Sequence, residues 1–192
     1  IRLSLVGSEM CIRDSHKYRD EASVFNDDIQ GTAAVALAGL FSALRITNGK
    51  LRDQRVLFLG AGEAATGIAD LIVSAMMAEG LSETEALQRN WLVDSRGLVV
   101  KGRENLSGHK LRYAHDQAPI GDFLTAIKTL KPTAIIGVAA VGGAFTPEVL
   151  RTMAELNEQP VIFALSNPTS KAECSAEEAY RCLLYTSPSP RD

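Results

Sequence analysis

Three stretches of the sequence combine residue types that can do chemistry, and the first is a glycine loop. The pattern Gly60-x-Gly62-x-x-Ala65 comes directly after the apolar run 55–59. In such a loop the first glycine allows a tight turn, the second lets the backbone approach a pyrophosphate, and the small third residue lets a helix pack closely on its strand. The free N–H groups at the start of that helix favour a bound phosphate. The pattern therefore predicts a dinucleotide-binding loop made of Gly60, Ala61, Gly62, Glu63, Ala64 and Ala65.

The second stretch is Asp94-Ser95-Arg96, at the end of a predicted strand over 91–93. An acid at this place can accept a hydrogen bond from a ribose hydroxyl. Asp94 lies 32 residues after Gly62, more than the usual spacing of about 20. Ser82 and Glu85 form a capping box, and the extra helix that it predicts over 83–89 accounts for the excess.

Ser95 and Arg96 bear on which dinucleotide binds. A hydroxyl and a guanidinium can hold a 2′-phosphate, and Arg matches phosphate geometry. Asp94 opposes this because a carboxylate repels phosphate, and Arg96 as a solvated loop residue is the alternative. We expect NADP to be preferred over NAD, with Arg112 assisting from the following loop.

The third stretch is the acidic pair Asp27-Asp28, which we expect in a polar turn between a strand and a helix. Carboxylate oxygens bind hard cations such as Mg²⁺, which keep water and substrate ligands. A solvated, capped turn is the alternative interpretation of this pair. Asn167 follows a predicted strand at the sheet edge where open α/β sheets bind ligands, although its position before Pro168 also fits a simple turn.

The elements that must position these residues alternate along the chain. The apolar and capping patterns predict strands over 55–59, 91–93, 133–138 and 161–165. They predict helices over 33–46, 63–79, 83–89 and 121–130, another that opens at Thr146-Pro147, and a loop over 95–118. Alternating strands and helices predict an α/β fold, a doubly wound, mostly parallel sheet of the Rossmann type.

Composition excludes several classes of protein. The chain has 192 residues, a formal net charge of −3, 46% hydrophobic residues and no Lys/Arg-rich run, so we expect no nucleic-acid partner. We expect the longest apolar stretch, 33–44, to be too short to cross a membrane. The three cysteines match no metal or disulfide pattern, which indicates a reducing compartment.

The two ends differ from the body of the chain. Residues 1–15 lack a periodicity that continues into the neighbouring segment, and 182–192 end in a Ser-Pro repeat; both resemble translated adapter sequence. We therefore expect non-native ends at 1–15 and 182–192, the end of a catalytic domain with its acidic loop at 16–50, and a truncated NAD(P)-binding domain at 51–181.

Five motifs in order resemble malic enzymes of the large, eukaryotic-type class: FNDDIQGTAAVALAGL, VLFLGAGEAATGIA, WLVDSRGL, PTAIIGVAAVGGAFTPEVL and FALSNPTSKAE. The resemblance covers 16–181. It implies oxidative decarboxylation of L-malate to pyruvate and CO2, with NAD(P)⁺ and Mn²⁺ or Mg²⁺. It also implies that Asp28 is a metal ligand, that Asp27 belongs to the catalytic hydrogen-bond network, that Gly60–Glu63 bind phosphate, and that Asn167 touches substrate and cofactor.

The sequence departs from that family in what it lacks. The family's upstream Glu-Asp metal ligands, its catalytic lysine and tyrosine, and a downstream substrate asparagine have no counterpart here. We therefore expect the chain alone to be inactive, and its parent to be a cytoplasmic homo-oligomer, with mitochondrial and plastid forms left open.

Three alternatives remain open for the function. A malolactic-type enzyme shares both loops but retains its bound NAD. An amino-acid dehydrogenase has a similar fold but uses no metal, which leaves Asp27-Asp28 unexplained. A non-catalytic dinucleotide-binding module fits the chain as it stands.

The expected ends generate a first prediction. Hydrogen exchange should find no protection before about Ser15 or after about Arg181, because these segments have no apolar pattern to bury. Strong protection of 3–6 or of 183–185 would contradict the assignment.

Overall fold

The computed structural model describes residues 21, 23, 25–104, 106 and 108–184. In this part of the chain five strands form one sheet, in the order β3-β2-β1-β4-β5. All neighbouring strands pair in parallel except β2 and β3, which are antiparallel. The first described strand, β1, lies at the centre of the sheet and later strands add on both sides, so the predicted doubly wound, mostly parallel sheet is confirmed. The strands are β1 (Val56–Leu59), β2 (Asn90–Asp94), β3 (Gly97–Leu98), β4 (Ala134–Gly137) and β5 (Val161–Ala164).

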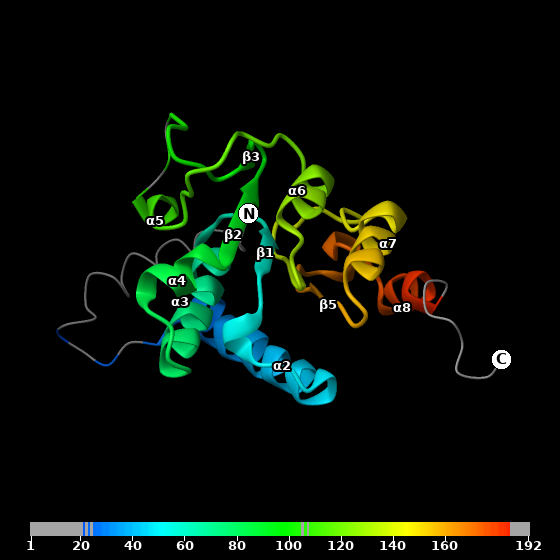
Figure 1. Cartoon of the computed structure of the whole chain (residues 1–192), viewed down its shortest axis with the longest axis horizontal. Helices are drawn as coiled ribbons and strands as arrows, with labels where there is room; N and C mark the ends of the chain where they lie inside the picture. Colours follow the sequence, from blue (N-terminus) through cyan, green and yellow to red (C-terminus); the bar gives the residue numbers. More distant parts are fainter. Residues whose placement is uncertain (1–20, 22, 24, 105, 107, 185–192) are drawn as a thin grey trace, which may run out of the picture.

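Helices cover both faces of the sheet, with α2, α3 and α4 on one side and α6, α7 and α8 on the other (Figure 1). The helical elements are η1 (Asp27–Gly31), α2 (Thr32–Thr47), η2 (Leu51–Asp53), α3 (Glu63–Ala78), α4 (Glu83–Gln88), α5 (Gly108–Leu111), α6 (Phe123–Leu130), α7 (Pro147–Leu156), η3 (Thr169–Lys171) and α8 (Ala176–Leu184).

Alternation along the strands divides the core into two layers. Phe58 and Ile136 pack into the layer beneath α2 and α3, whereas Leu57 and Ile135 pack into the layer beneath α6 and α7. All four side chains are fully buried. Burial on both faces is why the strands read as continuous apolar runs rather than as alternating ones.

Local capping chemistry sets the helix ends as the sequence predicts. The capping box of Ser82 and Glu85 is formed at the start of α4, and Thr146 caps α7 ahead of Pro147. Asn48 ends α2 in the left-handed conformation. The expected loop over 95–118 instead contains β3 and α5, which are too short to leave a periodic pattern.

Two expectations about the borders of the fold need correction. Among the described residues no strand precedes the acidic pair; Asp27–Gly31 form a π-helical turn that continues directly into α2. At the other border α8 runs to Leu184, three residues beyond the expected limit at Arg181, because no Gly or Pro interrupts the helix between Ala176 and Leu184. The segments 1–15 and 185–192 of the expected ends, and the approach to the acidic pair at 16–20, lie outside the described residues.

The joined helix also changes an expectation about membranes. The stretch from Ile29 to Thr47 is long and apolar enough, by length and composition, to cross a membrane, which the shorter expected segment was not. One face of this helix packs in the core through Ala33, Ala36, Leu40 and Leu44. A core helix of a soluble protein passes the same test of length and composition, so this feature carries little weight.

The packing of α2 generates a second prediction. Leu40→Ala should lower the free energy of unfolding by about 2–5 kcal/mol, because Leu40 is fully buried and its loss leaves a cavity. Ile46→Ala is the matched control, because Ile46 is 82% exposed on the same helix and should change stability by less than about 0.5 kcal/mol. Urea unfolding measures both, and equal effects would show that α2 does not pack as described.

Candidate functional site

The glycine loop is held between two strands at the centre of the sheet. Gly60 N–H donates to Val93 O at 2.8 Å, and Gly60 has a φ of 119°, in the region that side chains disfavour. A Cβ on Gly60 would meet Val138 O at 2.9 Å. Gly62 is different, because a Cβ there would meet nothing within 4 Å. Gly60 is thus needed by the turn itself, whereas Gly62 leaves open space beside the backbone.

The N-terminus of α3 adjoins that space. Gly62 occupies the N-cap position without a side chain, so the N–H groups of the first turn have no side-chain cap. Thr66 donates its hydroxyl hydrogen to the carbonyls of Gly62 and Glu63, each at 3.2 Å, and does not compete for those N–H groups. Ala65, 1% exposed, lets α3 pack directly on the sheet. Unpaired N–H groups and the positive end of the helix dipole favour an anion here.

A cavity of about 580 Å³ opens over this helix start. Its walls are the glycine loop, the ends of β1 and β2, the loop after β4, and α5. Among the expected site residues, it brings together Gly60, Ala61, Gly62, Glu63, Asp94 and Ser95. A cavity of this size at the carboxyl ends of parallel strands is a typical ligand site of an open α/β sheet.

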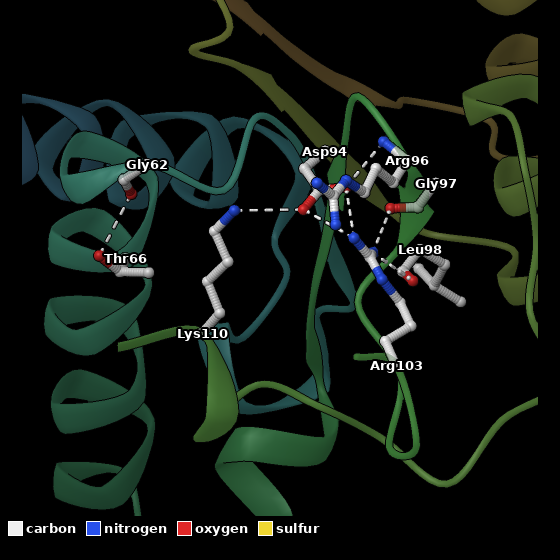
Figure 2. A network of polar contacts seen from close by, with 8 residues as sticks. All are labelled: Gly62, Thr66, Asp94, Arg96, Gly97, Leu98, Arg103 and Lys110. Carbon is white, nitrogen blue, oxygen red and sulfur yellow. Dashed lines mark hydrogen bonds and ion pairs between the residues drawn. The ribbon is translucent and has the colours of Figure 1, made fainter. Parts of the chain in front are cut away.

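Asp94 is surrounded by cations that the sequence analysis did not select (Figure 2). Arg103 donates to both carboxylate oxygens of Asp94, at 2.9 and 3.0 Å, and Lys110 Nζ lies 3.2 Å from Oδ2. The backbone N–H of Arg96 donates to Oδ1 at 2.9 Å. Burial raises the pKa of Asp94, but the hydrogen bonds from Arg96, Arg103 and Lys110 outweigh it and hold the pKa below its usual value. The carboxylate is therefore ionised and its charge is compensated.

The two cations on Asp94 have different surroundings. Arg103 also donates to the carbonyls of Gly97 and Leu98, so it braces the β2–β3 turn. Lys110 comes from α5 and its ammonium group lies between the start of α3 and Asp94 in Figure 2, at the cavity wall. Neither residue could be selected from the sequence, since both lie in a segment without periodicity and nothing there indicates which base turns toward Asp94.

Two arginines from the sequence analysis are placed differently from each other. Arg96 is exposed beside Asp94, as expected for a residue directly after β2. Arg112 pairs instead with Asp70 at 2.8 Å and Glu83 at 2.7 Å, and it lines a separate groove. The expectation that Arg112 assists the preference for NADP is therefore corrected: the basic side chain of this segment that meets Asp94 is Lys110.

A second contact from α5 joins two residues that line the cavity. His109 Nδ1 lies 3.3 Å from the Glu63 carboxylate at the first position of α3. This contact turns the Glu63 carboxylate toward α5. Together with the contact of Lys110 with Asp94, it holds α5 beside the glycine loop.

The remaining expected residues do not line the cavity. The turn that carries Asp27 and Asp28 packs on α3, where the missing side chain of Gly67 leaves room for Ile29. Asn167 is exposed after β5. Within the described part of the chain, no group of three or more His, Cys, Asp or Glu residues could hold a metal ion. The side chain of Asp28 lies outside what the structure describes.

Comparison with known proteins places this geometry in a family. A family model described as "Malic enzyme, NAD binding domain" matches residues 29–190. The NADP-dependent malic enzyme of Rattus norvegicus is 59% identical over 92% of this chain, and that of Homo sapiens is 55% identical over 92%. A mitochondrial NADP-dependent malic enzyme of Mus musculus is 52% identical over 91%. The chain spans about a third of the length of these relatives, 30–32%.

Solved structures give the same result for the fold. The malic enzyme of Entamoeba histolytica superposes with a TM-score of 0.72 at 26% identity, over 90% of this chain and 34% of that one. The NAD-dependent malic enzyme of Thermotoga maritima superposes with a TM-score of 0.71 at 26% identity, over 90% and 43%. Sequence and fold agree along nearly the whole chain: it belongs to the malic enzyme family, in the region of the NAD-binding domain.

Proposed function

We propose that this chain is the dinucleotide-binding part of an enzyme that converts L-malate to pyruvate and CO2 by oxidative decarboxylation. The observation that carries the proposal is the cavity at the start of α3, where Gly62 leaves open space beside uncapped N–H groups. The names of the relatives, all malic enzymes, support the substrate. The rest of the parent protein would supply what the chain lacks.

The chain's residues divide the work of holding NAD(P). The N–H groups at Gly62–Ala64 would bind the pyrophosphate, because the helix start offers uncapped donors there. Ser95 and Lys110 would face the adenosine ribose from the β2 side of the cavity. Bound at this site, the nicotinamide supplies the acceptor for the hydride of malate C2. The protein's contribution is to orient that ring and to exclude water around it.

The finer proposal is a preference for NADP. Arg103 and Lys110 compensate the charge of Asp94, which removes the repulsion that a bare carboxylate would exert on a 2′-phosphate. Lys110 at the cavity wall and Arg96 beside it then provide positive charge for that phosphate. This balance supports NADP more strongly than the sequence alone does, where Asp94 opposed it.

The residues of this chain fit a metal ion less well than they fit a dinucleotide. When bound, Mn²⁺ or Mg²⁺ would stabilise the enolate that forms as CO2 leaves. The described residues form no metal site, and one carboxylate is too few for a cation that draws on several oxygen ligands. We propose Asp28 as a single ligand and Asp27 as its hydrogen-bonding neighbour, with the other ligands in segments of the relatives that this chain does not span. Asn167 is proposed to touch substrate and cofactor.

The proposed preference generates a third prediction. Lys110→Ala should weaken NADP binding to this chain about 10-fold or more, because a charge-assisted contact contributes about 1.5–3 kcal/mol, and should leave NAD binding nearly unchanged. Arg96→Ala should act in the same direction. Calorimetric titration measures both affinities, with Lys101→Ala as the control because Lys101 is exposed at the separate groove. If Lys110→Ala weakened the binding of NADP and of NAD equally, Lys110 would not determine the specificity.

A fourth prediction concerns turnover. This chain should not decarboxylate malate in the presence of Mn²⁺ and NADP, since the members of a catalytic unit act together and the loss of one already removes most of the rate. An absorbance assay at the nicotinamide band checks this, with a full-length relative as the positive control. Measurable turnover would mean that the proposed roles of the absent segments are wrong.

A further inference from the structure

A buried carboxylate outside the proposed cofactor cradle has no role so far. Glu173 is 0% exposed and is the only fully buried charged side chain among the described residues. It lies between η3 and α8, and its carboxylate reaches back to the carboxyl ends of β4 and β5. A buried charge is costly unless hydrogen bonds compensate it, so its partners indicate what it is for.

Every partner of this carboxylate is a donor from one of two loops. Oε1 accepts from the Ala139 N–H at 3.3 Å and from the Ser166 hydroxyl at 2.5 Å, and Oε2 accepts from the Ser166 N–H at 3.4 Å. The Ser166 hydroxyl in turn accepts from the Ala140 N–H at 2.9 Å. One side chain thus ties the loop after β4 to the loop after β5.

The surroundings are shaped to keep the carboxylate in this place. A Cβ on Gly137, in β4, would overlap the carboxyl group of Glu173, so only glycine leaves room there. Ala140 has a φ of 54°, a left-handed conformation that is uncommon for alanine. The hydrogen bond from Ala140 to Ser166 holds the loop in that conformation.

The two loops lie on the side of the cavity away from Asp94. Val138, Ala139 and Val141 line the cavity, and Asn167 follows Ser166 directly. In the strand order, β2 with Asp94 lies on one side of β1 and β4 with β5 on the other. A dinucleotide that crosses the glycine loop at this switch point would place its adenosine half over β2 and its nicotinamide half over β4 and β5.

We propose that Glu173 is a positioning residue for the nicotinamide half of the cofactor: it fixes the loops after β4 and β5, including Asn167, against the cavity. This proposal rests on the proposed dinucleotide function. Glu173 does not touch the cofactor itself. It acts through Ala139 and Ser166, so its effect should be confined to one half of the ligand.

The test compares two probes on the same chain, NADPH and adenosine 2′,5′-bisphosphate, which lacks the nicotinamide half. Glu173→Gln keeps the size of the side chain but places an NH2 group among donors. The variant should bind NADPH about tenfold more weakly and lose most of the change in nicotinamide fluorescence that binding produces. Its affinity for adenosine 2′,5′-bisphosphate should stay within about twofold, because the β2 side is untouched.

The ratio of the two affinities separates positioning from folding. Irreversibly unfolded chain only lowers the number of sites, and reversible unfolding weakens both apparent affinities by the same factor, so neither changes the ratio. Glu155→Gln is the matched control, an exposed glutamate on α7 that loses the same charge. If Glu173→Gln does not fold, Ser166→Ala serves as the second variant, since it removes the hydroxyl between Ala140 and Glu173 from a half-buried position; it should shift the ratio in the same direction.

The outcomes distinguish this inference from the function on which it rests. If the unaltered chain binds neither probe, the proposed dinucleotide site is wrong and this inference falls with it. If it binds both probes and Glu173→Gln or its substitute Ser166→Ala weakens them equally, the site stands and the positioning role is overturned. A selective loss of NADPH affinity and of the fluorescence change supports the role.

Discussion

The close approach of three strands around Gly60 is the constraint on which the rest of the site depends. Its N–H group bonds to Val93 in β2, and its missing side chain leaves room for the carbonyl of Val138 after β4. A side chain here would have to separate β1 from β4, and a φ of 119° would strain it further. Because the loop is pinned to both neighbours, the first turn of α3 begins at one place above the sheet edge. The cavity, Asp94 and the loop after β4 all take their positions from it.

The arrangement on the β2 side follows from the cost of a partly buried charge. Asp94 is the last residue of β2 and is partly buried, and a carboxylate in such a place is stable only with hydrogen-bond donors around it. Arg103 and Lys110 supply them from the segment after β3, and Arg103 also donates to the two carbonyls of β3. The ion cluster thus orders a segment that has little secondary structure of its own. A residue that opposes phosphate when considered alone becomes, with its partners, the support for a positively charged wall.

Local sequence patterns were sufficient to predict the strands and helices. They were insufficient to predict contacts between residues that lie far apart in the sequence. The apolar runs that form β1, β2, β4 and β5 and the caps at Ser82 and Thr146 depend on near neighbours in sequence, so local patterns predicted them. The glycine loop was predictable for the same reason. Which base meets Asp94 depends on how α5 folds back, and the choice of Lys110 over Arg112 is a matter of rotation within one short turn. The continuation of the turn Asp27–Gly31 into α2 was not predicted, because it depends on the packing of this turn on Gly67 of α3, which is a tertiary contact. The contacts of Glu173 could not be predicted from local patterns, because its partners Ala139 and Ser166 lie in other loops.

The two sides of the cavity are built with different physical means, and this bears on what each can do. On the β2 side the contacts are ionic and partly exposed, so they tolerate small shifts and respond to charge, which suits discrimination between ligands that differ by a phosphate. On the β4–β5 side the key group is a fully buried carboxylate with directional hydrogen bonds and a glycine that admits no larger residue. Such contacts discriminate little between ligands of different charge, but they hold the backbone in place. This suits the nicotinamide ring, because its orientation decides whether hydride can transfer. If the two halves of the ligand are held as we propose, one by charge and the other by geometry, changes at Lys110 or Arg96 would alter the cofactor preference without disturbing the loops around Asn167.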